Sequence, residues 1–586
     1  MKLHLFLVNS QKITHFQVGD RTYSNAAVEQ VLDYALDLKN FHEQSHSRKI
    51  VPVVVSTEAP DEPPLIQQYE DGVFHPIKCN KANFIATILT ILDQTLHSEP
   101  LLPEGWINSV YKPTPTILEA AQALYRGHGV GEISRSDSGA INLDRTAQAI
   151  AEIIDFSKAN DRKSICFITG VPGAGKTLAG LNIANERHNV DEGEHAVFLS
   201  GNGPLVEVLQ EALARNDVAE KKGADERITK NVALAKTKAF IQNIHHFRDD
   251  ALQTDLPPVE KVAVFDEAQR AWTLEQTSSF MSRKKGISNF EMSEPDFLIS
   301  VLDRHKDWAI IICLIGGGQE INTGEAGLTE WFSAIKKGYS HWDVYVSNRL
   351  VDKEYTNGQD IYGSFQSGQL AVRNELHLSV SLRSFRSEKV SAFVKSFLDL
   401  DEQNANSLFK ELTAKYPIAM TRNIDTAKEW LRSKARGSEG VGIIASSGAY
   451  RLKPYGIHVK SKIDPKTWFL NDNTDVRSSG FLEEVATEFD IQGLELDWVC
   501  VAWDANLRKD GEKWEFKNFR GTEWQNINDE IRERYLLNTY RVLLTRARQG
   551  MIIFVPLGNS EDRTRLPDYY NSIHNYLVAI GVPSLD

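Results

Sequence analysis

The sequence Phe167-Ile-Thr-Gly-Val-Pro-Gly-Ala-Gly-Lys-Thr177 contains the complete pattern of a phosphate-binding loop, in the setting that the pattern requires. An apolar, strand-like run (165–168) precedes the loop, and a helix-like run (178–184) follows it. Such a loop turns backbone N–H groups toward phosphates, and the helix N-terminus adds positive charge. The loop residues are Gly170, Val171, Pro172, Gly173, Ala174, Gly175, Lys176 and Thr177. We expect Lys176 to contact phosphate and Thr177 to ligate Mg²⁺, so the stretch predicts a site for ATP or GTP.

Composition narrows the possible functions beyond nucleotide binding. The chain has 586 residues and a net charge of −13, so it is long enough for about three or four domains, and any nucleic-acid site must be a local basic surface. Four cysteines lie far apart without a Cys-x-x-Cys pair, which is typical of a reduced, cytoplasmic protein. The sequence shows neither a signal peptide nor an apolar run that would cross a membrane.

Outward from the loop, short apolar strands alternate with helical patterns. The strand-like runs are residues 196–200, 262–265, 309–315, 441–446, 498–503 and 551–555. This alternation is typical of a parallel sheet covered on both faces by helices. Residues 1–98 have a smaller α/β pattern, and a stretch rich in Pro, Gly and Ser follows it. We predict domain boundaries at 1–98, 99–140 (a linker), 141–378 and 379–586.

Two carboxylates follow the strand-like run at 262–265. We expect Asp266 to take part in the coordination shell of a Mg²⁺ ion and Glu267 to polarise an attacking water molecule. An Asp-Glu pair alone is more often a solvated turn, but the phosphate loop upstream favours the catalytic interpretation. A third strand, at 309–315, leads into Gly316-Gly-Gly-Gln319. Gln319 is a candidate sensor of the γ-phosphate, and a simple glycine turn is the alternative.

The motifs in order resemble those of superfamily 1 helicases, and more narrowly those of the Schlafen group 3-like DNA/RNA helicase family of bacteria. The motifs that carry the resemblance are Asp266-Glu-Ala-Gln269, Gly318-Gln319, Ser384-Phe-Arg-Ser387, Thr487-Glu-Phe-Asp-Ile-Gln-Gly-Leu-Glu495 and Tyr540-Arg-Val-Leu-Leu-Thr-Arg-Ala-Arg548. The resemblance covers about residues 141–558. It implies an α/β fold of tandem RecA-like P-loop NTPase domains with parallel sheets, to which residues 1–98 add a small α/β domain.

The resemblance also implies roles for residues outside the loop. In such motors ATP lies between the two RecA-like domains, and arginines of the second domain stabilise the transferred phosphate. Arg546 and Arg386 are the candidates, with Arg383 as the competitor of Arg386. Gly493 lies in the turn that resembles the element coupling nucleotide to the nucleic-acid strand. Gln148 lies where helicases place a glutamine that recognises adenine.

Nucleic-acid contacts are expected in two stretches of the first domain. Residues 198–202 resemble helicase motif Ia, and residues 244–247 resemble motif Ib. Motors of this kind hold phosphates with small polar groups and stack bases on aromatic rings. Trp272 is a candidate for stacking on a base, with a position in the core as the alternative. Basic patches at 283–285, 336–337 and 432–436 are either part of a strand path or solvated surface.

The N-terminal region resembles a nuclease in one helix only. Gln30-Val-Leu-Asp-Tyr34 resembles the Gln-x-x-x-Tyr helix of RecB-type PD-(D/E)XK nucleases. The strand that should carry an acidic residue and a Glu-x-Lys reads Thr14-His-Phe-Gln-Val18 and has neither. Without these groups the fold cannot hold its Mg²⁺. We therefore expect an inactive nuclease-like remnant, a nuclease-like domain truncated at its N-terminus, or an unrelated small α/β domain.

Together these observations predict an ATP-dependent translocase or helicase that uses ATP and Mg²⁺ and acts on single-stranded nucleic acid. DNA is favoured over RNA, protein partners are allowed for, and a membrane is not expected. The catalytic set is Lys176, Glu267, Arg386 and Arg546, with Thr177 and Asp266 at the metal. One alternative is a switch ATPase that regulates a partner protein without translocating. The other is an ATPase-nuclease of a DNA defence system.

Overall fold

The computed structural model describes most of the chain, in two compact units. The described residues are 21–45, 48–69, 71–95, 103–107, 109, 116–127, 137–171, 173–187, 193–223, 228–287, 290–316, 327–351, 365, 368–379, 385–413 and 416–586. One unit comprises Met1–Thr114 with Lys434–Glu439, and the other comprises Pro115–Ser433 with Gly440–Asp586. Within these described residues, the helices all fall short of the length and apolar character that crossing a membrane demands.

The smaller unit is an α/β domain built on a short parallel pair of strands. Its elements are α1 (Asn25–Phe41), β1 (Val53–Val55), β2 (Ile77–Cys79), α2 (Phe84–Thr95) and α3 (Pro103–Ile107). Helix α1 starts at Ser24, whose side chain accepts a hydrogen bond from the N–H of Ala27, and its buried face includes Leu32 and Leu36. The predicted helix around Gln30 and Tyr34 is therefore present. The strand expected at 14–18 lies outside the described residues.

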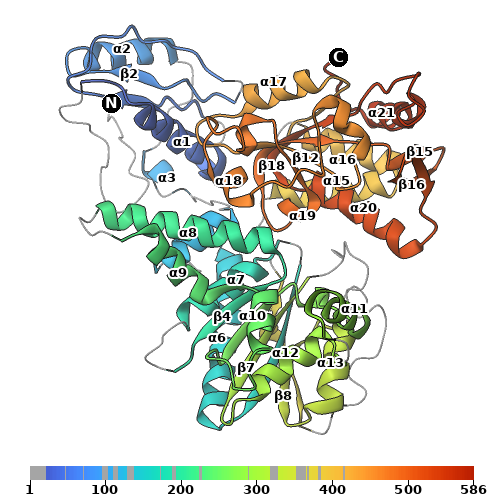
Figure 1. Ribbon diagram of the computed structural model, residues 1–586. Helices are drawn as coiled ribbons and strands as arrows, with labels where there is room; N and C mark the ends of the chain where they lie inside the picture. The colour runs from blue at the N-terminus through green and yellow to red at the C-terminus, as the bar shows by residue number, and fades with distance from the viewer. Residues whose placement is uncertain are drawn as a thin grey trace. The chain divides into compact units, whose positions relative to one another are not determined.

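The larger unit holds two parallel sheets, and we call the part around each sheet a lobe (Figure 1). The first lobe has the strand order β5-β4-β6-β7-β3-β8-β9, with β10 also pairing with β3. Its strands are β3 (Lys163–Gly170), β4 (Ala196–Ser200), β5 (Ile241–Asn243), β6 (Val262–Asp266), β7 (Ala309–Ile315), β8 (Trp342–Ser347), β9 (Leu370–Arg373) and β10 (His377–Leu378). Every pairing in this sheet is parallel.

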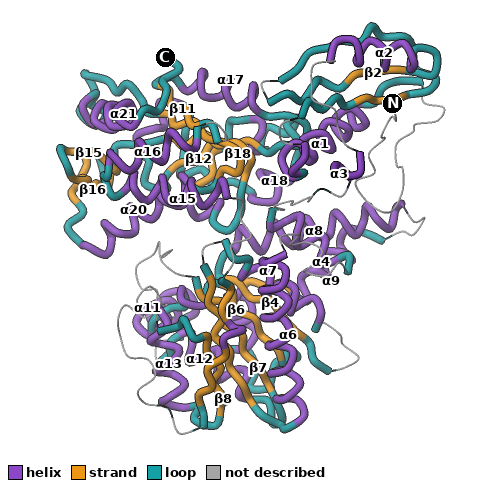
Figure 2. Tube along the Cα trace, turned by 180° about the vertical axis from the view of Figure 1, so that it is seen from behind, coloured by secondary structure: helices purple, strands orange, loops and turns teal. Residues whose placement is uncertain are grey.

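Helices cover both faces of the first sheet because alternate residues of its strands are apolar on opposite sides. On β3, Cys166 and Ile168 belong to one hydrophobic cluster, and Ile165 and Phe167 belong to another. The flanking helices are α4 (Ile117–Tyr125), α6 (Asp137–Ala159), α7 (Lys176–Glu186), α8 (Gly203–Gly223), α9 (Lys230–Phe240), α10 (Ile244–Ala251), α11 (Leu274–Phe280), α12 (Glu294–Asp303) and α13 (Gly327–Gly338). Figure 2 shows β6 and β7 inside this helical cover.

The second lobe has a five-stranded parallel sheet of order β11-β18-β14-β12-β13. Its strands are β11 (Ile418–Thr421), β12 (Val441–Ala445), β13 (Val485–Thr487), β14 (Leu496–Ala502) and β18 (Ala547–Phe554). Its helices are α15 (Phe385–Leu398), α16 (Glu402–Leu412), α17 (Ile424–Lys434), α18 (Pro465–Leu470), α19 (Glu488–Ile491), α20 (Glu530–Leu544) and α21 (Asp568–Ile580). A small antiparallel sheet is added between β14 and α20: β15 (Leu507–Asp510), β16 (Lys513–Arg520) and β17 (Glu523–Asn526).

These sheets confirm the predicted fold class, with tandem RecA-like domains of parallel strands and a small N-terminal α/β domain. All six strands expected downstream of the loop are present. The antiparallel sheet was not predicted from the sequence, because β15 and β17 have four residues each with one apolar side chain, and the three aromatic residues of β16 are interleaved with charged and amide side chains. Part of the predicted linker is helical, because Ala120, Ala121 and Leu124 of α4 join the core of the first lobe. The domain boundaries themselves stay a prediction.

Candidate active site

The candidate site lies at the carboxyl edge of the first sheet, where three neighbouring strands end in polar or glycine residues. Strand β3 leads into the phosphate loop, β6 ends at Asp266, and β7 leads to Gly316. Because β6, β7 and β3 are adjacent and parallel, their carboxyl ends lie side by side. Ligands of open α/β sheets bind at this edge.

The phosphate loop uses glycines where a side chain would not fit or would be strained. Gly173 and Gly175 have φ angles of 78° and 81°, in the left-handed region that favours glycine. A Cβ on Gly170 would lie 2.8 Å from Cβ of Leu378, so β10 closes the back of the loop. The Nζ of Lys176 donates to the carbonyl oxygen of Gly170 at 2.8 Å. Pro172 lies outside the described residues.

The helix after the loop is packed tightly on the sheet. Helix α7 begins at Lys176, and Gly180 faces strands β6 and β7. A Cβ on Gly180 would lie 2.6 Å from Cδ1 of Leu314 and 3.0 Å from Cγ1 of Val264. The helix that carries the loop is therefore held against the sheet by close contact of its backbone.

The two predicted metal ligands lie side by side. The Oγ1 of Thr177 donates to Oδ1 and Oδ2 of Asp266 at 3.2 and 3.4 Å. Burial, together with the nearby charge of Glu267, raises the pKa of Asp266 to about 7, although the Thr177 hydroxyl and the Lys176 ammonium act in the opposite direction. A bound cation would favour the ionised carboxylate, and a carboxylate beside a hydroxyl is a donor set that suits Mg²⁺. The residues present therefore fit a magnesium site.

A hydrogen-bonded chain holds the proposed catalytic carboxylate. Glu267 has a left-handed φ of 52°, a conformation that costs free energy in a residue with a side chain and is typical of functional sites. The Nε2 of Gln269 donates a short hydrogen bond to Oε2 of Glu267, and its Oε1 accepts from the N–H of Gly316 at 3.0 Å. Gln269 therefore connects the end of β6 with the end of β7. The motif had included Gln269 without assigning it this role.

The helix with the predicted adenine-recognition residue is fixed to the same sheet. On α6, Asn142 donates through Nδ2 to the carbonyl oxygen of His377 at 3.3 Å, and Thr146 donates through Oγ1 to that of Glu375 at 2.6 Å. Gln148 lies on the exposed side of this helix. The predicted sensor Gln319 lies outside the described residues.

The two predicted arginines belong to the second lobe. Arg546 follows α20, is 6% exposed, and donates through Nε to the carbonyl oxygen of Val542 at 3.2 Å. Arg386 is in the first turn of α15, and its side chain lies outside the description, as does the competitor Arg383. Arg548 is a separate arginine, whose Nη1 is 3.5 Å from Oδ1 of Asp497.

The structure brings together two stretches that the sequence connected only through the resemblance. Asn202, after β4, donates through Nδ2 a short hydrogen bond to the carbonyl oxygen of Gln492, after α19. Gly493 has a φ of 78°, and a Cβ there would lie 3.2 Å from Cδ2 of Leu205. The motif Ia-like stretch of the first lobe therefore contacts the Gly493 turn of the second.

Trp272 packs among side chains of the first lobe. Its ring lies 5.1 Å from those of His245 and Phe280, and the guanidinium of Arg248 is 5.3 Å from it. The backbone N–H of Trp272 donates to Oε2 of Glu294 at 2.9 Å. Trp272 is half-buried, so a position in the core and stacking on a base both remain predictions.

A fully buried arginine joins the motif Ib-like helix to the segment after Asp266. Arg248 of α10 is 0% exposed, and its Nη1 donates to Oε1 of Glu294 at 3.3 Å. Burial, together with the charge of Arg248, lowers the pKa of the neighbouring His245 to about 4. Neither Arg248 nor Glu294 belongs to a motif. In the sequence, Arg248 is followed by Asp249 and Asp250, and Glu294 stands near Asp296, so the pattern marks neither residue as buried and does not identify the pair.

The carboxyl edge of the second sheet also carries buried carboxylates. Burial raises the pKa of Glu488 and of Asp504. Glu488 accepts hydrogen bonds from the N–H and Oγ of Ser447 at 2.7 and 2.6 Å. Asp504 accepts from the N–H of Arg451 at 2.9 Å and from the hydroxyl of Tyr570 at 3.0 Å. These acids connect the ends of β12, β13 and β14 with α21.

A protein-family model matches most of the chain. Residues 163–556 match the model described as Schlafen group 3, DNA/RNA helicase domain. A search of curated proteins found no match.

Three solved structures show distant similarity. The DUF1998 helicase MrfA bound to DNA is 11% identical with a TM-score of 0.26, over 74% of this chain and 54% of that one, so the chain spans about half the length of that protein. The Hef helicase domain of Pyrococcus furiosus is 14% identical with a TM-score of 0.23, over 72% and 97% of the two chains. A DEAD box protein from Methanococcus jannaschii is 11% identical with a TM-score of 0.21, over 73% and 89%.

Proposed function

The chain belongs to the Schlafen group 3 DNA/RNA helicase domain family, and from this premise we propose that it is an ATP-driven translocase or helicase acting on single-stranded nucleic acid. One observation carries the proposal: the phosphate loop, the Thr177–Asp266 pair and the Glu267–Gln269 pair occupy neighbouring strand ends of one sheet. This arrangement offers groups to bind phosphate, groups to bind a metal ion, and a carboxylate to activate the attacking water. ATP hydrolysis requires all three.

In the proposed division of labour, the loop backbone and Lys176 bind the β- and γ-phosphates. Thr177 and Asp266 would hold Mg²⁺, which neutralises charge on the phosphate oxygens when it is bound. Glu267 orients the attacking water and accepts its proton. Gln269 fixes the Glu267 carboxylate against the N–H of Gly316 at the end of β7, so the base keeps one orientation.

The second lobe is proposed to complete the site from the other side of the nucleotide. Arg546 and Arg386 would stabilise the charge that develops on the transferred phosphate. Gln148 would contact adenine, Gln319 would sense the γ-phosphate, and Gly493 would couple nucleotide to the strand. The contact between Asn202 and Gln492 supports this coupling, because it connects the two lobes through residues that resemble nucleic-acid-binding motifs.

An ATPase assay across single- and double-stranded DNA and RNA tests the proposal. We expect single strands to stimulate hydrolysis, DNA more than RNA, because a motor hydrolyses ATP faster when it moves along its track. Hydrolysis that no nucleic acid stimulates would instead favour the switch ATPase. Strand cleavage that requires Mg²⁺ and persists in Lys176→Ala would favour the nuclease alternative.

A further inference from the structure

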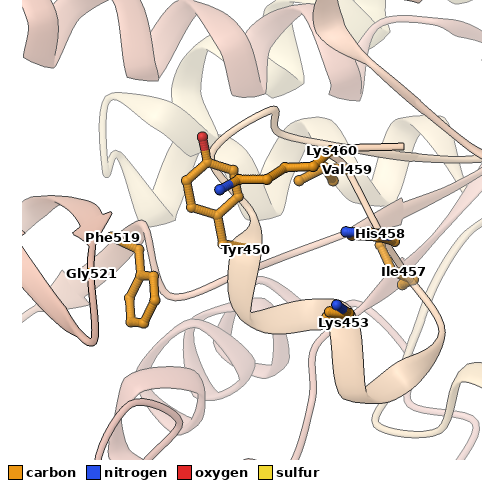
Figure 3. A pocket seen from close by; sticks show the side chains of 8 residues that line it. All are labelled: Tyr450, Lys453, Ile457, His458, Val459, Lys460, Phe519 and Gly521. Atoms are coloured by element: carbon orange, nitrogen blue, oxygen red, sulfur yellow. The ribbon is translucent and has the colours of Figure 1, made fainter. Parts of the chain in front are cut away.

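A pocket in the second lobe lies outside the residues assigned to ATP hydrolysis. It has a volume of about 230 Å³ (Figure 3). It is lined by Tyr450, Lys453, Ile457, His458, Val459, Lys460, Phe519 and Gly521. The lining is aromatic and basic, which is the combination that binds a nucleotide through its base and its phosphate.

The pocket is placed where α/β sheets bind ligands. The 3₁₀ helix Tyr450–Tyr455 follows the carboxyl end of β12 after a four-residue turn. The Nδ2 of Asn506, after β14, donates to Oγ of Ser446 in that turn at 2.9 Å. Phe519 and Gly521 come from the end of β16 and the turn that follows it. The added antiparallel sheet therefore forms one wall at the carboxyl edge of the second sheet.

The local charge favours an anion. Residues 450–462 include four Lys or Arg and one His but no Asp or Glu, although the whole chain has a net charge of −13. Lys453, His458 and Lys460 are exposed. The Nζ of Lys460 is 4.3 Å from the ring centroid of Tyr450, and Figure 3 shows this side chain extending toward the ring. A basic site of this kind within an acidic protein attracts phosphates locally.

The aromatic wall is held in place from behind. Arg451 donates through Nε to Oγ1 of Thr564 at 2.8 Å, and its guanidinium is 5.4 Å from the ring of Phe519. The ring of Trp524 contacts that of Phe519 edge to face at 5.0 Å, and its Nε1 donates to the carbonyl oxygen of Thr564 at 2.8 Å. A ring supported in this way loses little conformational entropy when a base stacks on it.

The volume limits the size of the ligand. Pockets for whole small-molecule ligands measure about 300–1,000 Å³. The present pocket, at about 230 Å³, is smaller than this range. It suits one unit of a polymer better than a complete cofactor.

We propose that this pocket binds one nucleotide of a single strand, with the base against Tyr450 and Phe519 and the flanking phosphates on Lys453 and Lys460. The inference rests on the proposed function, since it presumes that the protein binds single strands. It assigns to the second lobe a strand contact that none of the motifs includes.

Binding of a labelled oligothymidylate to the full chain, measured by fluorescence anisotropy at several salt concentrations, tests the proposal. In Lys453→Ala/Lys460→Ala we expect the slope of log affinity against log salt to fall by about 1.4, because two phosphate contacts are lost at about 0.7 each. Lys513→Ala, an exposed lysine at the other end of β16, is the matched control and should keep the wild-type slope.

A separate substitution tests the stacking of a base on Tyr450. Tyr450→Ala should weaken binding by about 5-fold or more, the loss expected for one stacked base. Tyr450→Phe, which keeps the ring, should bind like the wild type. A strand carrying 5-bromouracil should also cross-link to Tyr450 or Phe519, as mapped by mass spectrometry of the peptides.

The outcomes separate this inference from the proposed function. If the wild type binds no single strand, the proposed function fails. If the wild type binds and the pocket variants match it in slope and affinity, the pocket assignment is overturned while the proposed function stands. Binding of adenosine monophosphate that depends on Lys453 and Lys460, with strand binding unaffected, would overturn the strand assignment in favour of a free nucleotide.

Discussion

The two parallel sheets of the larger unit hold their buried carboxylates differently. At the edge of the first sheet, the Thr177 hydroxyl lies 3.2 and 3.4 Å from the oxygens of Asp266, and Glu267 is in a left-handed conformation. At the edge of the second sheet, Glu488 accepts two hydrogen bonds of 2.7 and 2.6 Å from Ser447. Burial raises the pKa of both Asp266 and Glu488.

This difference in hydrogen bonding indicates a different role for each edge. The long contacts of the Thr177–Asp266 pair and the backbone strain at Glu267 mark groups whose geometry improves when a ligand arrives, although Gln269 already orients the Glu267 carboxylate. The short contacts of Glu488 mark groups that already satisfy one another. We therefore propose that the first edge performs the chemistry, and that the second provides arginines and strand contacts from a preformed frame. The following predictions test that contrast, beginning with the largest effect.

Substitution of Lys176 or of Glu267 should abolish hydrolysis, and the two variants should differ in ATP binding. Lys176→Ala removes a phosphate contact, so both binding and hydrolysis are lost. Glu267→Gln keeps the loop intact, so it should bind ATP while turnover falls by about 10⁴-fold, the upper range for loss of a general base. Equilibrium binding of a fluorescent ATP analogue and steady-state phosphate release measure the two effects. Tight ATP binding by Lys176→Ala would contradict this division of labour.

Arg546→Ala tests whether the second lobe takes part in chemistry at all. An arginine that stabilises the transferred phosphate contributes about 10³-fold or more to turnover, so kcat should fall by that amount with a smaller change in ATP affinity. Arg548→Ala, from the same motif but placed beside Asp497, is the control and should retain most activity. Since Arg546 is buried, thermal unfolding of Arg546→Ala itself checks that the loss is not a folding defect. Normal turnover in a folded Arg546 variant would remove this residue from the site.

Gly316→Ala tests the connection between the ends of β6 and β7. A Cβ there would lie 2.9 Å from Oε2 of Glu267 and 3.0 Å from Nε2 of Gln269, so these side chains must shift. Displacing a catalytic group by a fraction of an ångström to an ångström costs about 10²-fold in rate. We expect that loss in kcat with ATP affinity retained. Gly338→Ala, where the added Cβ meets nothing within 4 Å, should leave turnover unchanged.

Ser447→Ala should affect stability more than catalysis. It removes the hydroxyl that donates to Oε1 of Glu488 at 2.6 Å, and a hydrogen bond to a charged group contributes about 2 kcal/mol. The midpoint of thermal unfolding should therefore fall, while the exposed Ser461→Ala should not change it. A loss of hydrolysis without a loss of stability would show that the second edge is less preformed than its hydrogen bonds indicate.

Sequence patterns were sufficient to predict the fold class and to locate the polar residues that follow individual strands. The phosphate loop, Asp266 and Glu267 could be located because each motif is continuous in the chain and follows an apolar strand. The same continuity predicted the helix around Gln30 and Tyr34, where Nε2 of Gln30 donates to the hydroxyl of Tyr34 at 2.9 Å.

Contacts between distant residues could not be predicted in this way. Gln269 and Gly316 are 47 positions apart, and Arg248 and Glu294 are 46 apart. Each pair forms only because the strand order places its elements together. The pocket beside Tyr450 was missed for a related reason: its wall is an antiparallel sheet whose strand β16 is half-buried and interleaves its aromatic residues with charged ones.

The close packing of Gly180 against Leu314 and Val264 has a consequence for how nucleotide binding is transmitted. A helix whose backbone touches the sheet cannot rotate or slide without a large steric cost, so α7 and strands β6 and β7 respond to ATP as one body. The rearrangement must then occur in the segments after the strands, around Gly316 and around the turn that contacts Asn202. In hydrogen-exchange terms, amide protons of α7 beyond its first, phosphate-binding turn should exchange at the same slow rate with and without ATP, and those of the two turns should change.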